Sequence, residues 1–142
     1  MLSTQPMVIV VEDNPADAQI TKEVLSELDA NLKLVHCADG EGLLRLLPVS
    51  NIEDIRFIIL DLGLPGLHGK EVLRRLAGHP TWKNLPVIVF SSTENMEDIL
   101  ECYHLGSNAF VRKPCTYEEF EHVVGSMHRF WSGANLTPAM GQ

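Results

Sequence analysis

Short apolar runs alternate along this chain with segments of helical periodicity, and this alternation limits the possible folds more than any other feature. Val, Ile, Leu and Phe dominate each run, with few polar residues between them. Such runs are typical of strands that are buried on both faces of a parallel sheet. The expected strands are 7–11, 32–36, 57–60, 86–90 and, with a weaker pattern, 108–111.

A segment with apolar residues at helical spacing follows each of these runs. The first has Asn14 as its expected N-cap and Pro15 at its first helical position. The last begins at Thr116, where Thr116 and Glu119 have the spacing of a capping box. The remaining segments lie at about 43–47, 70–78 and 95–106, and the last one continues through residue 131.

The order of the elements predicts an α/β fold of the (βα)₅ type. This is a doubly wound, five-stranded parallel sheet with helices on both faces and right-handed crossovers. The 142 residues fit one domain of ordinary size. We expect this domain to span 6–131 and to be followed by a loosely ordered C-terminal tail at 132–142, with no output domain.

Composition excludes several classes of partner and environment. The formal net charge of −8 argues against nucleic acid or an anionic membrane as a primary partner. The three cysteines are widely spaced, which indicates reduced thiols in a cytoplasmic protein rather than a disulfide framework. No apolar run approaches the roughly 20 residues of a membrane span. The N-terminus also lacks the basic region of a signal peptide.

Polar and charged residues follow the expected strands at their carboxyl ends. Glu12 and Asp13 follow the first strand, Asp61 follows the third, Ser91 follows the fourth and Lys113 follows the fifth. In an open α/β sheet, ligands bind beyond these strand ends. Because a partly buried carboxylate must be paired, the acids need a cation. The sequence therefore predicts a charged site at this edge of the sheet.

The kinds of residue at this edge favour a phosphoryl group held beside a metal ion. Two or three carboxylates without His or Cys suit a hard cation, and Mg²⁺ fits better than Ca²⁺ because few protein ligands leave positions for water and phosphate. The carbonyl of Gly63 could add another oxygen ligand. Lys113 and Ser91 would contact phosphoryl oxygens. A carboxylate can act as a nucleophile, and Asp61 is the candidate.

These residues together give the chain a family resemblance. Glu12-Asp13, the segment DLGLPGLHG at 61–69, Ser91 and Lys113-Pro114 resemble the receiver domain of two-component response regulators. Ser91 lies 30 residues after Asp61 and Lys113 lies 52 residues after it, which fits the same family. The resemblance covers roughly 6–131 and implies a flavodoxin-like sheet with the strand order 2-1-3-4-5.

The resemblance also implies a chemistry. Asp61 would accept a phosphoryl group from a phosphohistidine on a sensor histidine kinase or a phosphotransfer protein. Asp13, Asp61 and the Gly63 carbonyl would bind Mg²⁺, with Glu12 helping through water. Lys113 would contact the phosphate. Such a protein catalyses only its own phosphorylation and dephosphorylation, so we do not expect an enzyme in the usual sense.

A switch is implied as well. Ser91 would move toward the phosphate and Phe110 would swing inward with it. The signal would then reach the face formed by the fourth helix, the fifth strand and the fifth helix. The resemblance further implies a cis peptide bond between Lys113 and Pro114.

Two short segments resemble a narrower group. EDNPADA at 12–18 and HRFW at 128–131 resemble the small stand-alone regulators that partner bacterial phytochromes. Aromatic residues at the end of a helix often mark an interface, so Phe130 and Trp131 lead us to expect a homodimer.

Other functions fit the same residues less well. A receiver fold that only binds partners and is never phosphorylated stays open, although the intact Asp61, Asp13 and Lys113 argue against it. A metal-dependent phosphatase would need a cap and a second acid two residues after Asp61, where Gly63 stands. Flavin binding conflicts with the acids after the first strand. The segment 63–70 does not match the phosphate-loop pattern GxxxxGK[ST].

Overall fold

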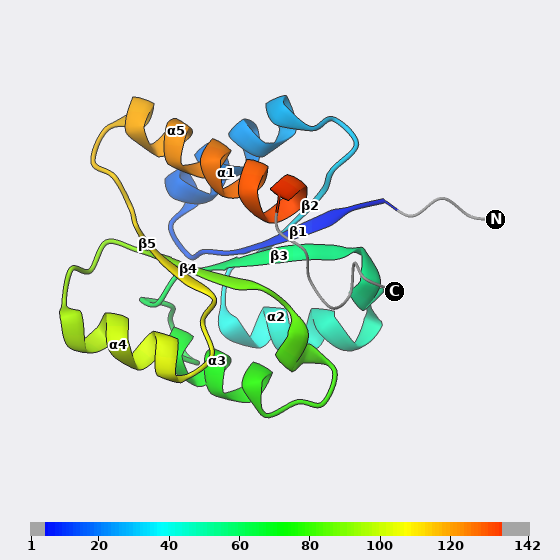
Figure 1. Ribbon diagram of the computed structural model, residues 1–142, viewed down its shortest axis with the longest axis vertical. Helices are drawn as coiled ribbons and strands as arrows, with labels where there is room; N and C mark the ends of the chain where they lie inside the picture. Colours follow the sequence, from blue (N-terminus) through cyan, green and yellow to red (C-terminus); the bar gives the residue numbers. More distant parts are fainter. Residues whose placement is uncertain (1–4, 135–142) are drawn as a thin grey trace.

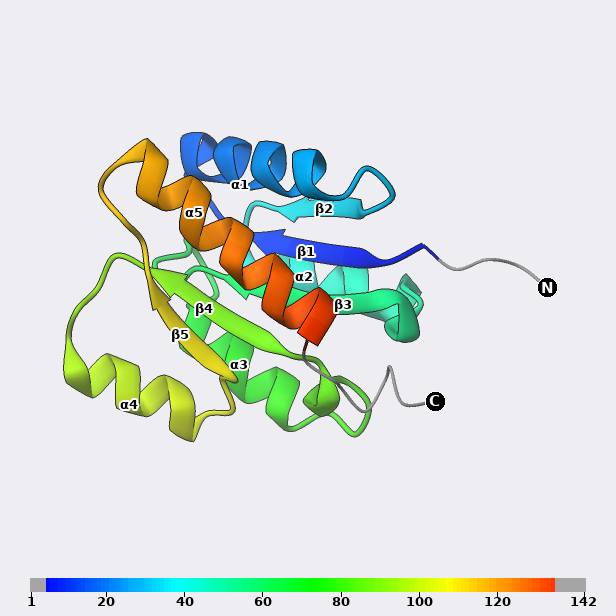
Figure 2. The same ribbon diagram turned by 45° about the horizontal axis from the view of Figure 1, so that its top comes forward.

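The computed structural model describes residues 5–134, which form a five-stranded parallel sheet between two layers of helices (Figures 1 and 2). The strand order is β2-β1-β3-β4-β5 and every pairing is parallel, as the sequence predicted. The strands are β1 Met7–Val11, β2 Lys33–Cys37, β3 Ile55–Leu60, β4 Val87–Ser91 and β5 Ala109–Arg112. The α-helices are α1 Pro15–Leu28, α2 Gly40–Leu46, α3 Gly69–Ala77, α4 Met96–His104 and α5 Tyr117–His128.

The central strands alternate their side chains between two apolar cores. On β1, Ile9 packs toward the core beneath α2 and α3, whereas Val8 and Val10 pack toward the core beneath α1 and α5. All residues of β1 and β4 are buried, while β2 and β5 at the two edges are partly exposed. The continuous apolar runs are thus explained by burial on both faces.

The predicted caps of the first and last helices are confirmed. The Asn14 side chain accepts hydrogen bonds from the amides of Ala16 and Asp17, and Pro15 occupies the first turn of α1. The hydroxyl of Thr116 accepts a hydrogen bond from the amide of Glu119 at 3.2 Å. Each cap satisfies amide groups that have no partner within the helix.

The fourth helix is only lightly packed against the rest of the molecule. Of the nine residues of α4, Cys102 is the buried one. The apolar residues Met96, Leu100 and Tyr103 are 62%, 61% and 48% exposed. In both views α4 lies on the same side of the sheet as α3, beside the β5 edge (Figures 1 and 2). Its helical periodicity was predicted correctly, but most of its apolar residues face away from the core.

Two expectations near the end of the chain need correction. The segment Arg129–Ala134 continues α5 as a π-helical turn, so the chain is still helical at 132–134, where the tail was expected to begin. The rest of that tail, 135–142, lies outside the described residues. The Lys113–Pro114 bond is trans, because no peptide bond within 5–134 is cis. The trans form is the favoured one before proline by about 0.5–1 kcal/mol.

Within 5–134, every helix is too short or too polar to cross a membrane.

Candidate functional site

The predicted site residues meet at the carboxyl edge of the sheet because the strand ladders continue beyond the strands. The amide of Asp61 donates to the carbonyl of Val11 at 3.0 Å. The amide of Lys113 donates to the carbonyl of Ser91 at 2.8 Å. These backbone bonds place the residue after each strand beside its neighbour. The parallel sheet therefore builds the site.

Three carboxylates come together as expected. Glu12, Asp13 and Asp61 each offer an oxygen atom that lies within 4.8 Å of the other two. Glu12 is buried, the Asp61 side chain is 12% exposed and Asp13 is exposed to solvent. An open side of this kind would let water and phosphate reach a cation. The oxygen-only donor set fits a hard divalent ion.

The ammonium group of Lys113 brings a positive charge into the site. Its Nζ lies 2.6 Å from Glu12 Oε1, 2.9 Å from Asp17 Oδ2 and 3.7 Å from Asp61 Oδ2. The side chain of Lys113 is 11% exposed, so these contacts are formed largely out of water. One ammonium group therefore faces three carboxylates, which leaves an excess of negative charge for a further cation.

Burial and the neighbouring charges together shift the pKa values of Glu12 and Lys113. Burial is the largest influence on Glu12 and, together with the charge of Asp61, it outweighs the contact with Lys113 and raises the pKa of Glu12 to about 7. Burial alone would lower the pKa of Lys113. Its hydrogen bonds to Glu12 and Asp17 reverse that effect, so the pKa is raised and Lys113 stays charged.

Asp17 is the residue that the sequence analysis missed. It lies in the first turn of α1, where an acidic residue usually needs no explanation beyond the helix dipole. The signal that would have found it is its place directly beyond the loop of Glu12 and Asp13, on the helix that begins at the same edge of the sheet. Asp17 contacts Lys113, which comes from the opposite end of the chain.

Ser91 and Gly63 line a hollow of about 260 Å³ beside the acids, with Leu62, His68, Lys70, Ser92, Thr93 and Asp98. Ser91 is 6% exposed, and its hydroxyl accepts a hydrogen bond from the amide of Thr93 at 3.4 Å. A side-chain carbon added at Gly63 would meet no atom within 4 Å, so this loop is open. The hollow therefore lies against the loop that directly follows Asp61.

Phe110 lies on the edge strand β5, away from the acids. Its side chain is partly buried and packs against the core beneath α3. Its amide donates a hydrogen bond to the hydroxyl of Tyr103 at 3.1 Å, which links β5 to α4. The residue thus connects a lightly packed helix to the sheet.

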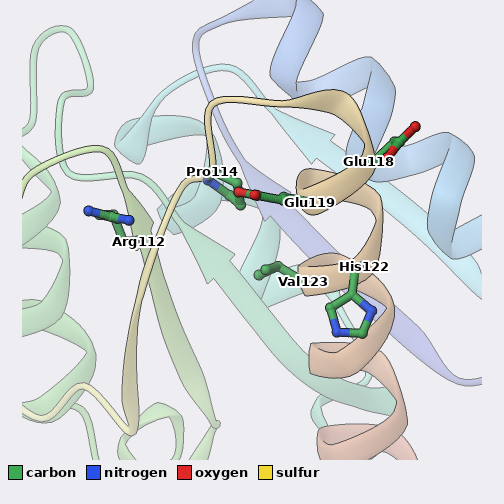
Figure 3. Close-up of a pocket in the computed structure, with 6 residues that line it drawn as sticks. All are labelled: Arg112, Pro114, Glu118, Glu119, His122 and Val123. Atoms are coloured by element: carbon green, nitrogen blue, oxygen red, sulfur yellow. The ribbon is translucent and has the colours of Figure 1, made fainter.

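A larger hollow of about 510 Å³ lies between β5 and α5 (Figure 3). Glu119 and Val123 extend from α5 toward Pro114, which follows β5 (Figure 3). Arg112, Glu118 and His122 complete its lining. Its lining comes from β5, from α5 and from the segment between them, and does not include Glu12, Asp13 or Asp61.

Comparison with known proteins agrees with this geometry. A family model described as the response regulator receiver domain matches residues 8–125. The response regulator Rcp1 of Synechocystis sp. is 28% identical over 137 residues, covering 94% of this chain and 93% of Rcp1. The crystal structure of its Mn²⁺-bound form has a TM-score of 0.83, with 28% identity over 94% of this chain and 99% of that one.

A phosphorylated regulator is also similar. The crystal structure of the phosphorylated cyanobacterial phytochrome response regulator RcpA has a TM-score of 0.88 and 29% identity, covering 95% of this chain and 99% of that chain. The matched family model covers most of the sequence. It includes all five strands apart from Met7, the first residue of β1. This chain belongs to the response regulator receiver domain family.

Proposed function

We propose that this protein is a phosphoacceptor of a two-component phosphorelay, in which Asp61 receives a phosphoryl group from a phosphohistidine. The observation that carries the proposal is the meeting of three carboxylates and Lys113 at one edge of the sheet. Asp61 is the acid that directly follows the central strand β3, and the next two residues, Leu62 and Gly63, line the open hollow. Glu12 is buried, which makes it a poorer nucleophile for an incoming donor.

The transfer would be an in-line substitution at phosphorus. A carboxylate oxygen of Asp61 forms a bond to phosphorus while the bond between phosphorus and the donor imidazole nitrogen breaks. That nitrogen keeps the bonding pair and takes up a proton. Lys113 contacts the phosphoryl oxygens and offsets their charge, which is the kind of stabilisation on which phosphoryl transfer depends.

Glu12, Asp13, Asp61 and the carbonyl of Gly63 would hold Mg²⁺. The ion would neutralise charge on the phosphoryl oxygens and so permit an anionic donor to approach the acids. The donor set supports this proposal because all of its atoms are oxygens. The Mn²⁺-bound form of the related Rcp1 supports a divalent ion in this family.

Ser91 and Phe110 would convert phosphorylation into a change of surface. Ser91 lines the hollow beside the acids and its hydroxyl has only a long hydrogen bond to hold it. Phe110 is tied through its amide to Tyr103 of α4. A shift of Ser91 toward the phosphate would therefore be passed to the face of α4, β5 and α5. If this face has two arrangements, the dianionic phosphoryl group shifts the equilibrium between them.

The proposed partner is a sensor histidine kinase of the bacteriophytochrome type or a phosphotransfer protein, and the exchange would take place in the cytoplasm. The similarity to Rcp1 and to the phytochrome regulator RcpA over almost the whole chain supports a phytochrome kinase. We also propose that two copies associate as a homodimer.

Acetyl phosphate and Mg²⁺ test the proposal without a kinase. After incubation, the intact mass of the protein should rise by one phosphoryl group, and the Asp61→Asn variant should show no change. A wild-type protein that binds Mg²⁺ but never gains this mass would contradict the proposal. That result would favour the alternative, a receiver fold that only binds partners.

A further inference from the structure

Asp17 is held firmly in a position where it competes for Lys113. Its amide donates to the Asn14 side chain at 3.2 Å, and its carbonyl accepts a hydrogen bond from the Thr21 hydroxyl at 2.8 Å. The Asp17 side chain is 26% exposed, so the contact with Lys113 is only partly screened by water. These bonds fix the backbone of Asp17 in the first turn of α1, from which its side chain accepts a hydrogen bond from Lys113.

The distances around Lys113 show which carboxylates the ammonium group prefers. An ammonium group has three hydrogen-bond donors. Glu12 and Asp17 lie at 2.6 and 2.9 Å from Nζ, which is hydrogen-bonding distance. Asp61 lies at 3.7 Å, which is too far for a hydrogen bond. Lys113 is therefore held away from the proposed phosphoacceptor by two other acids.

We propose that Asp17 is a positioning residue that restrains Lys113 before phosphorylation. This inference rests on the proposed function of Asp61. A bound cation would give Glu12 a second positive partner besides Lys113. Asp17 would then be the acceptor that still holds Lys113 away from Asp61. Transfer to Asp61 places phosphoryl oxygens in the site, and Lys113 leaves Asp17 to contact them. A contact that exists only before transfer stabilises the starting state and slows the reaction.

The Asp17→Asn variant tests this role at saturating Mg²⁺. Acetyl phosphate is the donor: an Asp61 oxygen bonds to phosphorus, and acetate leaves with the bonding pair. The initial rate, followed by intact mass, should rise about twofold to fivefold, as expected for loss of one partly exposed ion pair. The matched control is Glu23→Gln, which removes the same charge from the same helix, where the Glu23 carboxylate accepts a hydrogen bond from Gln19 at 2.8 Å. The rate of this control should equal that of the wild type.

A double-mutant cycle shows whether Asp17 acts through Lys113. In a Lys113→Met background, the Asp17→Asn change should leave the rate unaltered, because no ammonium group is left to restrain. An increase that persists in this background would mean that Asp17 acts by its charge alone, and this would overturn the proposal. An unchanged or slower rate in the single variant would overturn it as well.

A second readout does not depend on phosphorylation. In protein labelled with ¹⁵N-lysine, the ammonium resonance of Lys113 should shift in the Asp17→Asn variant and stay in place in the Glu23→Gln variant. If wild-type protein is never phosphorylated, the proposed function fails, and the resonance still shows whether the contact exists. If wild-type protein is phosphorylated and the Asp17→Asn rate is unchanged, only the positioning role fails.

Discussion

Single residues at the carboxyl edge of the sheet explain how Asp61 is stabilised. An acid at the end of a buried strand requires a cation, and the sequence predicted that a metal ion and Lys113 would together neutralise Asp61. The structure brings Lys113 to the site, but its shorter contacts are to Glu12 and Asp17. The meeting of the polar residues that follow the strands was predictable, because parallel strands have their carboxyl ends at the same edge of the sheet. Asp17 was not, because an acid in a first helical turn has an ordinary explanation.

Glu12 should make metal binding depend on pH. Its pKa is raised to about 7, so the group is mostly protonated at lower pH, and a cation must displace this proton to use the carboxylate. Because one proton must be displaced, the affinity for Mg²⁺ should fall about tenfold when the pH is lowered from about 8 to about 6. Isothermal titration calorimetry over this range measures both the affinity and the proton release. The Glu12→Gln variant, which cannot release this proton, should show a much flatter profile.

The elements of the fold differ in how far the sequence could predict them. Strands β1, β3 and β4 were predicted to within two residues, because burial on both faces leaves a continuous apolar run. The helix α4 was predicted from its periodicity, but the exposure of Met96 and Leu100 was not. Periodicity shows which residues share one side of a helix and does not show what covers that side.

Gly69 at the start of α3 fixes the loop that follows Asp61. A side-chain carbon at this position would lie 2.8 Å from the Asp61 carbonyl oxygen and 2.8 Å from the Leu62 α-carbon, both of them backbone atoms. The Gly69→Ala variant should therefore lose about 1–3 kcal/mol of unfolding free energy and should be phosphorylated more slowly. Urea denaturation and intact mass measure these effects.

The control for this prediction is at the other end of the same helix. A side-chain carbon at Gly78 would lie 3.4 Å from its nearest neighbour, the Arg74 carbonyl oxygen, which is an ordinary contact. Gly78→Ala should leave the phosphorylation rate unchanged. If both variants are phosphorylated at the same rate, the loop after Asp61 is not held by the close approach at Gly69.

The position of α4 depends on ion pairs with α3. Lys70 Nζ lies 2.6 Å from Asp98 Oδ1 and 2.8 Å from Glu101 Oε2. Because α4 has so little buried apolar surface, Lys70→Ala should speed hydrogen exchange of the α4 amides more than those of the central strands. Arg75→Ala is the matched control, because the ion pair of Arg75 within the described residues 5–134 is with Glu71 of the same helix. Equal exchange of α4 in both variants would contradict this account.

At the scale of the whole molecule, the charged site and the exposed apolar residues lie in different places. The acids are at the carboxyl edge of the sheet, whereas Met96, Leu100 and Tyr103 are exposed on α4. The hollow between β5 and α5 adds to this second surface (Figure 3). Such a separation suits a protein whose chemistry and partner binding take place at different sites. The family and the sheet order were predictable because several weak motifs agreed with one topology.

The end of α5 should contribute to a homodimer. Phe130 is 51% exposed and packs edge-to-face against Trp131, with ring centroids 5.2 Å apart. Light scattering across a dilution series should show the mass of two chains, with dissociation at low concentration. Phe130→Ser should weaken the association, whereas Val49→Ser, which changes an apolar residue with 82% exposure after α2, should not. The mass of one chain at every concentration would exclude a homodimer.

The central claim is that Asp61 carries the phosphoryl group. Protein phosphorylated with acetyl phosphate and Mg²⁺ can be reduced with borohydride, which converts an aspartyl phosphate to homoserine, and the peptide that contains residues 57–69 can then be sequenced by mass spectrometry. We predict homoserine at position 61 in the wild-type protein and none in protein incubated without the donor. Unchanged aspartate at position 61, together with homoserine at Asp13, 5-hydroxynorvaline at Glu12, or no reduced residue anywhere in the chain, would contradict the claim.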